Sequence, residues 1–218
     1  MVVLLHTCCG PCASACEPRL REEGHRVVLF FSNSNIDTRE EFDRRLEAAR
    51  RLGEADGVEV VADEYDHADW LEKVAAGFED EPEKGARCAR CFRYSLSRAA
   101  AWAAAHGFDA FTTSLTVSPH KVSPTVFAAG EDAAWAAGAK DCGGSAAAAP
   151  QFLKIDFKKR DGFLLSLKRS EELGLYRQSY CGCEFSRLNL RAKQAQGKGC
   201  SLPFQASCPR PDLSRTSH

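Results

Sequence analysis

Short apolar runs alternate with longer helical segments along most of this chain, and this alternation restricts the possible folds more than any other feature. Four runs resemble strands because they are continuously apolar or rich in β-branched and aromatic residues: 2–7, 26–32, 58–62 and 110–115. Helical patterns lie between and after them, at 13–23, 38–52, 66–76, 88–106, 124–138 and 164–173. This alternation predicts an α/β, Rossmann-like parallel sheet with helices on both faces.

The domain organisation follows from length and composition. A chain of 218 residues suits one well-buried domain, which we expect to be a single catalytic domain over 1–190. A glycine- and alanine-rich stretch at 141–150 is predicted to be a low-complexity insertion. Beyond it, 194–218 is rich in glycine, serine and proline, which predicts a flexible, cysteine-bearing C-terminal extension.

Bulk properties limit the protein's surroundings and partners. No apolar run approaches the roughly 20 residues that a membrane helix needs, and the opening apolar run is too brief for a signal peptide. We therefore expect a cytoplasmic protein with no membrane partner. The net charge of −1 gives no global attraction to nucleic acid, so an RNA partner would require a local basic patch.

The chain has eleven cysteines, and most lie in tight clusters. In a reducing compartment, such clusters bind metal or carry out redox chemistry more often than they form structural disulfides. The sequence Cys-Gly-Pro-Cys at 9–12 equals the thioredoxin active-site tetrapeptide, which leaves a thiol–disulfide oxidoreductase open as an alternative. The vicinal Cys8, the second cysteine pair and the length of the chain disfavour it.

Four cysteines on two segments form the second constellation: Cys8, Cys9, Cys88 and Cys91. Both segments begin predicted helices, whose N-termini favour deprotonated thiols and negatively charged groups. Four thiolates suit zinc or an iron–sulfur cluster. Adjacent ligands are unusual for structural zinc, so we favour iron–sulfur, and a zinc-stabilised RNA-binding module stays open.

Cys181-Gly182-Cys183 is a third tight pair, for which we expect a redox or metal-associated role. Cys12 lies close enough to the first pair to be a ligand of a second site or a reserve thiol, whereas Cys16 is expected only to pack. The remaining cysteines are expected to be incidental: Cys142, Cys200 and Cys208.

Three polar segments directly follow predicted strands: 8–9, 33–35 and 118–121. Ligands of open parallel sheets gather outside the carboxyl ends of the strands. The sequence therefore predicts that these segments meet at one edge of the sheet.

Six blocks of this sequence, in order, resemble one family, the cobalamin-independent epoxyqueuosine reductases of the QueH type (the DUF208 family). They read LHTCCGPC (5–12), FFSNSNI (30–36), EPEKGARCARC (81–91), FTTSLTVSPHK (111–121), DFKK (156–159) and YRQSYCGC (176–183). Members of this family often carry Ala at the position of Gly10 and Asn-Pro-Asn at 33–35. Neither departure affects an expected ligand.

The resemblance implies a HUP-type relative of the Rossmann fold and an oxidoreductase that reduces epoxyqueuosine to queuosine at the wobble position of tRNA. It implies a 4Fe-4S cluster on Cys8, Cys9, Cys88 and Cys91, a redox-active disulfide at Cys181 and Cys183, and an unidentified electron donor. It also implies a second metal, a mononuclear iron, whose ligands we expect among Cys12, Asp156 and Cys183.

Two further sets of residues are expected to serve this reaction. His120 or Tyr65 is a candidate proton donor. Seven basic residues are candidates for phosphate contacts: Arg87, Arg90, Arg93, Lys121, Lys158, Lys159 and Arg177.

Overall fold

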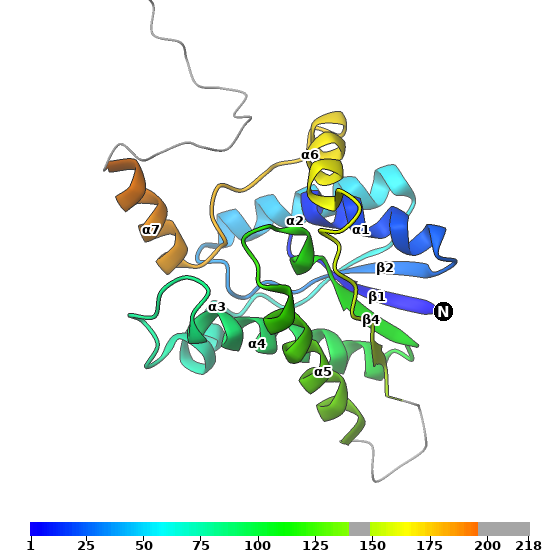
Figure 1. Cartoon of the computed structure of the whole chain (residues 1–218), viewed down its shortest axis with the longest axis horizontal. Coiled ribbons are helices and arrows are strands. Elements are labelled where there is room, and N and C mark those ends of the chain that lie inside the picture. The colour runs from blue at the N-terminus through cyan, green and yellow to red at the C-terminus, as the bar shows by residue number, and fades with distance from the viewer. Residues whose placement is uncertain (140–148, 196–218) are drawn as a thin grey trace, which may run out of the picture.

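A computed structural model describes residues 1–139 and 149–195 (Figure 1). All five strands of its sheet run parallel, in the order β3-β2-β1-β4-β5. The strands are β1 (Val2–His6), β2 (Arg26–Phe31), β3 (Val60–Ala62), β4 (Ala110–Thr113) and β5 (Gln151–Phe152). The helices are α1 (Gly10–Glu22), α2 (Arg39–Asp56), α3 (His67–Trp70), the π-helix η1 (Leu71–Ala75), α4 (Ala86–Ala105), the 3-10 helix η2 (Ser114–Val117), α5 (Ser123–Ala139), α6 (Gly162–Glu172) and α7 (Glu184–Ala195). The predicted α/β class is confirmed.

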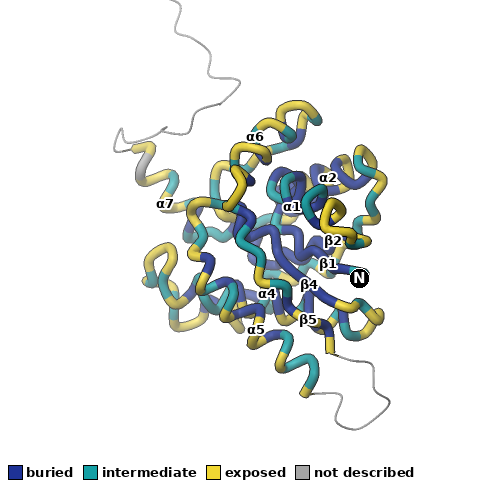
Figure 2. Tube along the Cα trace, turned by 45° about the vertical axis from the view of Figure 1, so that its right-hand side comes forward, coloured by how far each residue is buried: buried dark blue, intermediate teal, exposed yellow. Residues whose placement is uncertain are grey.

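Helices cover both faces of the sheet, as the alternation predicts (Figure 1). On one face, Phe111 and Val28 pack with apolar residues of α4 and α5. On the other face, Leu5 and Leu29 pack with residues of α1, and α6 contacts α1. The central strands are buried on both sides, which explains why their sequences are continuously apolar rather than alternating (Figure 2).

Several element boundaries differ from the prediction. The run at 110–115 ends as a strand at Thr113, because the Thr113 side chain accepts a hydrogen bond from the Leu115 backbone and begins η2. The two-residue strand β5 and the helix α7 were not predicted, and α7 continues past residue 190, where the catalytic domain was predicted to end. Thr38 is the N-cap of α2, since its hydroxyl accepts from the Glu41 N–H at 3.2 Å.

Parts of three predictions lie outside the described residues. Most of the insertion predicted at 141–150 and nearly all of the predicted tail fall there, as do Cys142, Cys200 and Cys208. Among the described residues, no helix combines the length and apolar character that crossing a bilayer requires.

Close approach of α1 to α2 depends on Gly10. A Cβ added at this position would lie 2.5 Å from the Ala48 carbonyl oxygen of α2, which is a backbone atom that cannot rotate away. The position after the Cys8–Cys9 turn therefore requires glycine in this chain.

We expect Gly10→Ala to lower the free energy of unfolding by about 1–3 kcal/mol, because the added methyl group forces α1 away from α2. Denaturant unfolding followed by circular dichroism measures this change. Glu22→Ala, at the exposed end of the same helix, is the matched control and should shift stability by less than about 0.5 kcal/mol. Equal stability of Gly10→Ala and wild type would contradict the close approach.

Candidate metal and redox site

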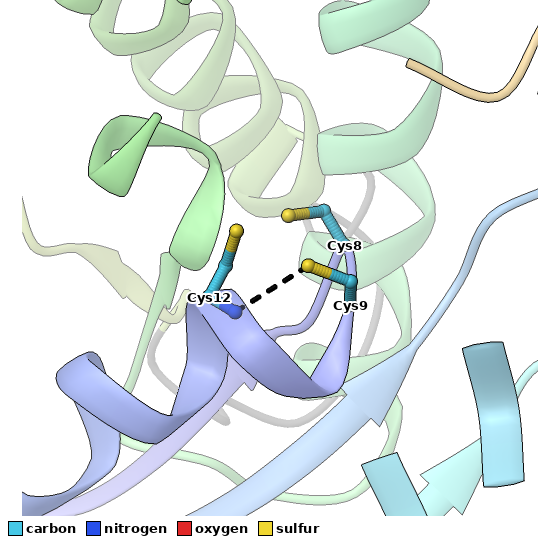
Figure 3. Close-up of side chains that lie close together, drawn as sticks. All are labelled: Cys8, Cys9 and Cys12. Atoms are coloured by element: carbon cyan, nitrogen blue, oxygen red, sulfur yellow. Dashed lines mark hydrogen bonds between the residues drawn. The ribbon is translucent and has the colours of Figure 1, made fainter. Parts of the chain in front are cut away.

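The turn after β1 brings three thiols together. The Sγ atoms of Cys8, Cys9 and Cys12 all lie within 4.8 Å of one another, and their side chains point into one shared space (Figure 3). Cys9 is the N-cap of α1, and its Sγ accepts a hydrogen bond from the Cys12 backbone N–H at 3.4 Å. The helix N-terminus thus begins at a sulfur ligand, and the group could hold a thiophilic metal.

The three thiols differ in how readily they lose a proton. Hydrogen bonds from the Cys12 and Cys8 thiols, supported by the N-cap position, hold the pKa of Cys9 well below its usual range. The hydrogen bond with Cys8, together with burial, raises the pKa of Cys12. Cys9 therefore loses its proton first. The neighbouring Cys16 has its pKa raised by burial and packs in the core, as expected.

Polar side chains from two neighbouring strands hold this turn in place. The Ser114 hydroxyl, just after β4, accepts from the Cys8 backbone N–H at 3.0 Å and donates to the Cys8 Sγ at 3.3 Å. The Asn33 side chain, just after β2, donates to the Thr7 carbonyl at 2.9 Å. The predicted meeting of segments that follow the strands is confirmed for 33–35 and the Cys8–Cys9 turn. From β4 the contact is made by Ser114 and not by the predicted segment 118–121, whose Lys121 contacts Cys181 instead.

His6 joins the three central strands where β1 ends. Its Nε2 lies 3.1 Å from the Ser32 carbonyl, which can only accept, so Nε2 carries the proton. Its Nδ1 lies 2.8 Å from Thr113 Oγ1 and therefore accepts from that hydroxyl. Burial lowers the pKa of His6 to about 4, so the ring is neutral near pH 7.

The cysteines of α4 lie outside the three-thiol group. The Cys88 Sγ accepts from the Lys84 backbone N–H at 3.3 Å, while Cys8 and Cys88 both pack against the same core cluster between the sheet and α4. Cys91 packs against Trp70 and Val74, and burial raises its pKa.

The segment with Cys181 and Cys183 lies over the loop that follows β2. The Gly182 carbonyl accepts from the Asp37 N–H at 3.0 Å, and Arg45 of α2 donates to the Cys181 carbonyl at 2.9 Å. A Cβ at Gly182 would lie 2.8 Å from the Asn35 side-chain nitrogen, and its φ of 140° also favours glycine.

The two sulfurs of this segment have different surroundings. Cys181 is exposed, and its Sγ accepts a hydrogen bond from the Lys121 ammonium at 2.7 Å. Cys183 packs in the same apolar cluster as Cys91 and Trp70, and burial raises its pKa to about 12. One sulfur is thus accessible beside a cation, and the other is shielded next to a cysteine of α4.

The remaining candidate ligand and proton donors have other partners. Asp156 accepts from the Lys158 backbone N–H at 3.2 Å and is not part of the three-thiol group. The Tyr65 hydroxyl donates to the Ile36 carbonyl at 2.7 Å, which fits a structural role. His120 is exposed in the loop between η2 and α5.

One of the predicted phosphate contacts is wrong. Arg87 is buried, and its guanidinium donates to the Phe78 and Glu79 carbonyls, so it cannot reach a phosphate. Three others also have partners within the protein: Lys121 on Cys181, Lys158 on Ser123 and Arg177 on Ser170. Lys159 is exposed.

Sequence reasoning missed three residues of the site. Ser114 contacts Cys8, Trp70 packs against Cys91, and the Gln178 side chain makes a smaller contribution than Cys12 and Cys8 to the lowered pKa of Cys9. Ser114 and Gln178 lie within blocks that carry the family resemblance, and this is the only signal that could have singled them out. Trp70 has no such signal.

Comparison with known proteins finds that residues 3–189 match the family described as Epoxyqueuosine reductase QueH. Among relatives of that name, the protein from Dehalococcoides mccartyi is 34% identical over 185 residues, which are 84% of this chain and 91% of that protein. The protein from Acinetobacter baylyi is 33% identical over 200 residues (90% and 85%). The protein from Thermotoga maritima is 32% identical over 197 residues (89% and 94%). The matched region includes the cysteines at 8–12, 88–91 and 181–183.

The buried neutral His6 predicts how stability depends on pH. Its pKa is about 4 in the folded protein and about 6.5 in the unfolded chain, so between these values only the unfolded chain binds the proton. The contribution of His6 is therefore present above pH 6.5 and is lost as the pH falls towards 4, by about 3 kcal/mol in total. Denaturant unfolding between pH 7 and pH 4.5 measures the loss.

His6→Gln, which cannot titrate, should show a weaker pH dependence over this range than wild type. Nuclear magnetic resonance of the His6 ring provides an independent check. A ring that titrates near pH 6.5 in the folded protein would contradict the buried neutral state.

Proposed function

This chain belongs to the epoxyqueuosine reductase QueH family of oxidoreductases, and we propose on that premise that it reduces epoxyqueuosine to queuosine at the wobble position of tRNA. The observation that carries this proposal is the family match over 3–189, which includes every candidate cysteine of the described site. Because tRNA is found in the cytoplasm, the proposal also places the protein there.

The reaction must break both carbon–oxygen bonds of the epoxide and form a carbon–carbon double bond. The oxygen leaves as water, which requires two electrons and two protons. Oxidation of two thiols to a disulfide releases two electrons and two protons, so the Cys181–Cys183 pair can supply one complete turnover. The exposure of Cys181 and its contact with Lys121 support its role as the sulfur through which an external donor restores the pair.

The donor set suits a 4Fe-4S cluster held by Cys8, Cys9, Cys88 and Cys91. Cys8 and Cys9 lie at a helix N-terminus, and Cys8 packs against the same core cluster as Cys88. When bound, such a cluster supplies electrons one at a time. The readily deprotonated Cys9 provides a thiolate ligand. The Ser114 hydroxyl orients Cys8 by accepting a hydrogen bond from the Cys8 backbone N–H.

A second, mononuclear iron would find its donors among Cys12, Asp156 and Cys183. The position of Cys12 supports its inclusion, since its Sγ lies within 4.8 Å of two cluster cysteines. Asp156 would first have to leave Lys158. The chain's own part in the reaction is to keep these sulfurs together and partly shielded from water.

One observation favours a second candidate function. The lowered pKa of Cys9, three residues before Cys12 at a helix N-terminus, is also what a thiol–disulfide oxidoreductase needs. In such an enzyme, Cys9 would attack a substrate disulfide and Cys12 would resolve it. Cys88 and Cys91 would then be dispensable.

Anaerobic reconstitution with iron and sulfide distinguishes these functions. We expect Cys88→Ala to lose the visible absorbance, iron and acid-labile sulfide of the cluster, because one of four ligands is missing. Cys12→Ala should lose iron but keep the sulfide, since it would hold only the mononuclear metal. Iron, sulfide and zinc analysis with absorbance spectra measures these changes.

Cys16→Ala is the matched control, because Cys16 is a buried cysteine of the same helix that packs in the core. It should keep both iron and sulfide. Full cluster content in Cys88→Ala would remove Cys88 as a ligand. A wild-type protein that takes up neither iron nor sulfide would favour the thiol–disulfide function, and zinc in place of iron would favour a zinc-stabilised RNA-binding module.

The substrate is tested by incubating reduced, reconstituted protein with tRNA that contains epoxyqueuosine, followed by nucleoside digestion and mass spectrometry. We expect the modified nucleoside to lose the mass of one oxygen atom. Multiple turnover should be abolished in Cys181→Ala and Cys183→Ala, because a single thiol cannot form the disulfide, and retained in Cys16→Ala. Unchanged nucleoside mass with an effective reductant present would count against the proposed reaction.

A further inference from the structure

A basic cavity lies beside α4, outside the cysteine site. Its volume is about 470 Å³, and it is formed by α3, η1 and the part of α4 from Arg90 to Ala101. Four cationic side chains line it together with one carboxylate: Lys73, Arg90, Arg93, Arg98 and Asp69.

The charges of this cavity do not cancel. Asp69 pairs with Lys73, while Arg93 and Arg98 pair with Asp132 and Asp63 at its edges. Arg90 donates to the backbone carbonyls of Lys73 and Val74, which fix its position without neutralising its charge. The lining itself thus holds four cations and one carboxylate, and the carboxylates of Asp132, Asp63 and Glu72 lie around it. The positive charge of the lining contrasts with the chain's overall charge of −1.

Two of the cations are available to a ligand. The Lys73 and Arg93 side chains are 61% and 57% exposed, and each has one surface ion pair. Such exposed pairs contribute about 0–1 kcal/mol, so an incoming phosphate can compete with the carboxylate at little cost. In contrast, Arg98 is held by two hydrogen bonds to Asp63 and forms a fixed wall.

The cavity shares a wall with the proposed redox site. Val74 and Tyr94 line the cavity and also pack in the apolar cluster that contains Cys91 and Cys183. Arg90 and Cys91 are neighbours on α4, with the arginine lining the cavity and the cysteine packed in the cluster. A nucleotide that reaches these cysteines would therefore carry its flanking phosphates close to the cavity.

We propose that this cavity binds phosphates of the tRNA backbone next to the wobble nucleotide, with Lys73 and Arg93 as the direct contacts. Arg90 and Arg98 provide fixed positive charge behind them. The inference rests on the proposed function, because it takes tRNA as the substrate. It keeps Arg90 and Arg93 from the phosphate contacts expected from the sequence, adds Lys73 and excludes the buried Arg87.

The test measures binding of the full-length protein to an unmodified anticodon stem-loop RNA at several salt concentrations. Each phosphate contact on single-stranded RNA contributes about 0.7 to the slope of log affinity against log salt. We expect Lys73→Gln with Arg93→Gln to reduce this slope by about 1.4 and to weaken binding roughly tenfold at 0.15 M salt. Each single variant should give about half of the slope change.

Lys154→Gln with Lys168→Gln is the matched control, because each is also an exposed cation with one surface carboxylate partner. The control should keep the wild-type slope. An unchanged slope in the cavity variant, or an equal loss in the control, would overturn the proposal. Circular dichroism melts verify that both double variants are folded.

The two proposals fail in different ways. If the wild-type protein binds the stem-loop with the expected salt dependence but removes no oxygen from epoxyqueuosine-tRNA, the proposed reaction is wrong and the RNA-binding cavity stands. If oxygen is removed but the cavity variant binds like wild type, the cavity is wrong and the reaction stands.

Discussion

At the carboxyl end of β1, one buried side chain holds three strands together. There His6 accepts a hydrogen bond from Thr113 and donates one to the Ser32 carbonyl, so a single neutral ring links the ends of three parallel strands. Both contacts require the neutral ring with its proton on Nε2. The two hydrogen bonds therefore fix the relative positions of these strands, and the ring does more than fill space. Only Thr7 separates this anchor from Cys8 and Cys9, so it restricts where their turn begins.

From that anchor, the site is built with backbone groups more than with charged side chains. The N-terminus of α1 stabilises the Cys9 sulfur, and the Ser114 hydroxyl satisfies both the N–H and the Sγ of Cys8. Gly10 lets α1 approach α2 closely enough for this turn to form. A set of buried thiols can therefore be kept ready for a metal without a buried counter-charge, whose desolvation would be costly.

The sequence predicts the architecture well because continuous apolar runs and helical periodicity are local signals. It also predicts that polar segments meet at the strand ends, because parallel strands leave little choice. The expected closeness of Cys12 to Cys8 and Cys9 is confirmed. The sequence does not predict β5, whose two residues are too few for a pattern. Nor does it show that Arg87 is buried. In a charged segment, the sequence does not distinguish an exposed arginine from one whose guanidinium donates to buried carbonyls, as that of Arg87 does to Phe78 and Glu79.

Helix α4 shows how one element can serve two kinds of chemistry. Its first turns direct Cys88 and Cys91 towards apolar clusters, where burial keeps Cys91 from losing its proton in the absence of a metal. The arginines at 90, 93 and 98 recur at helical spacing and line the cavity on another side. Because the helix is rigid, its cysteines and arginines keep a fixed spacing. The RNA that we propose to bind along the arginines would then lie at a constant distance from the cysteines. The segment Cys88-Ala89-Arg90-Cys91 has the cysteine spacing of a metal motif, and it also carries a cation, Arg90, between its two cysteines.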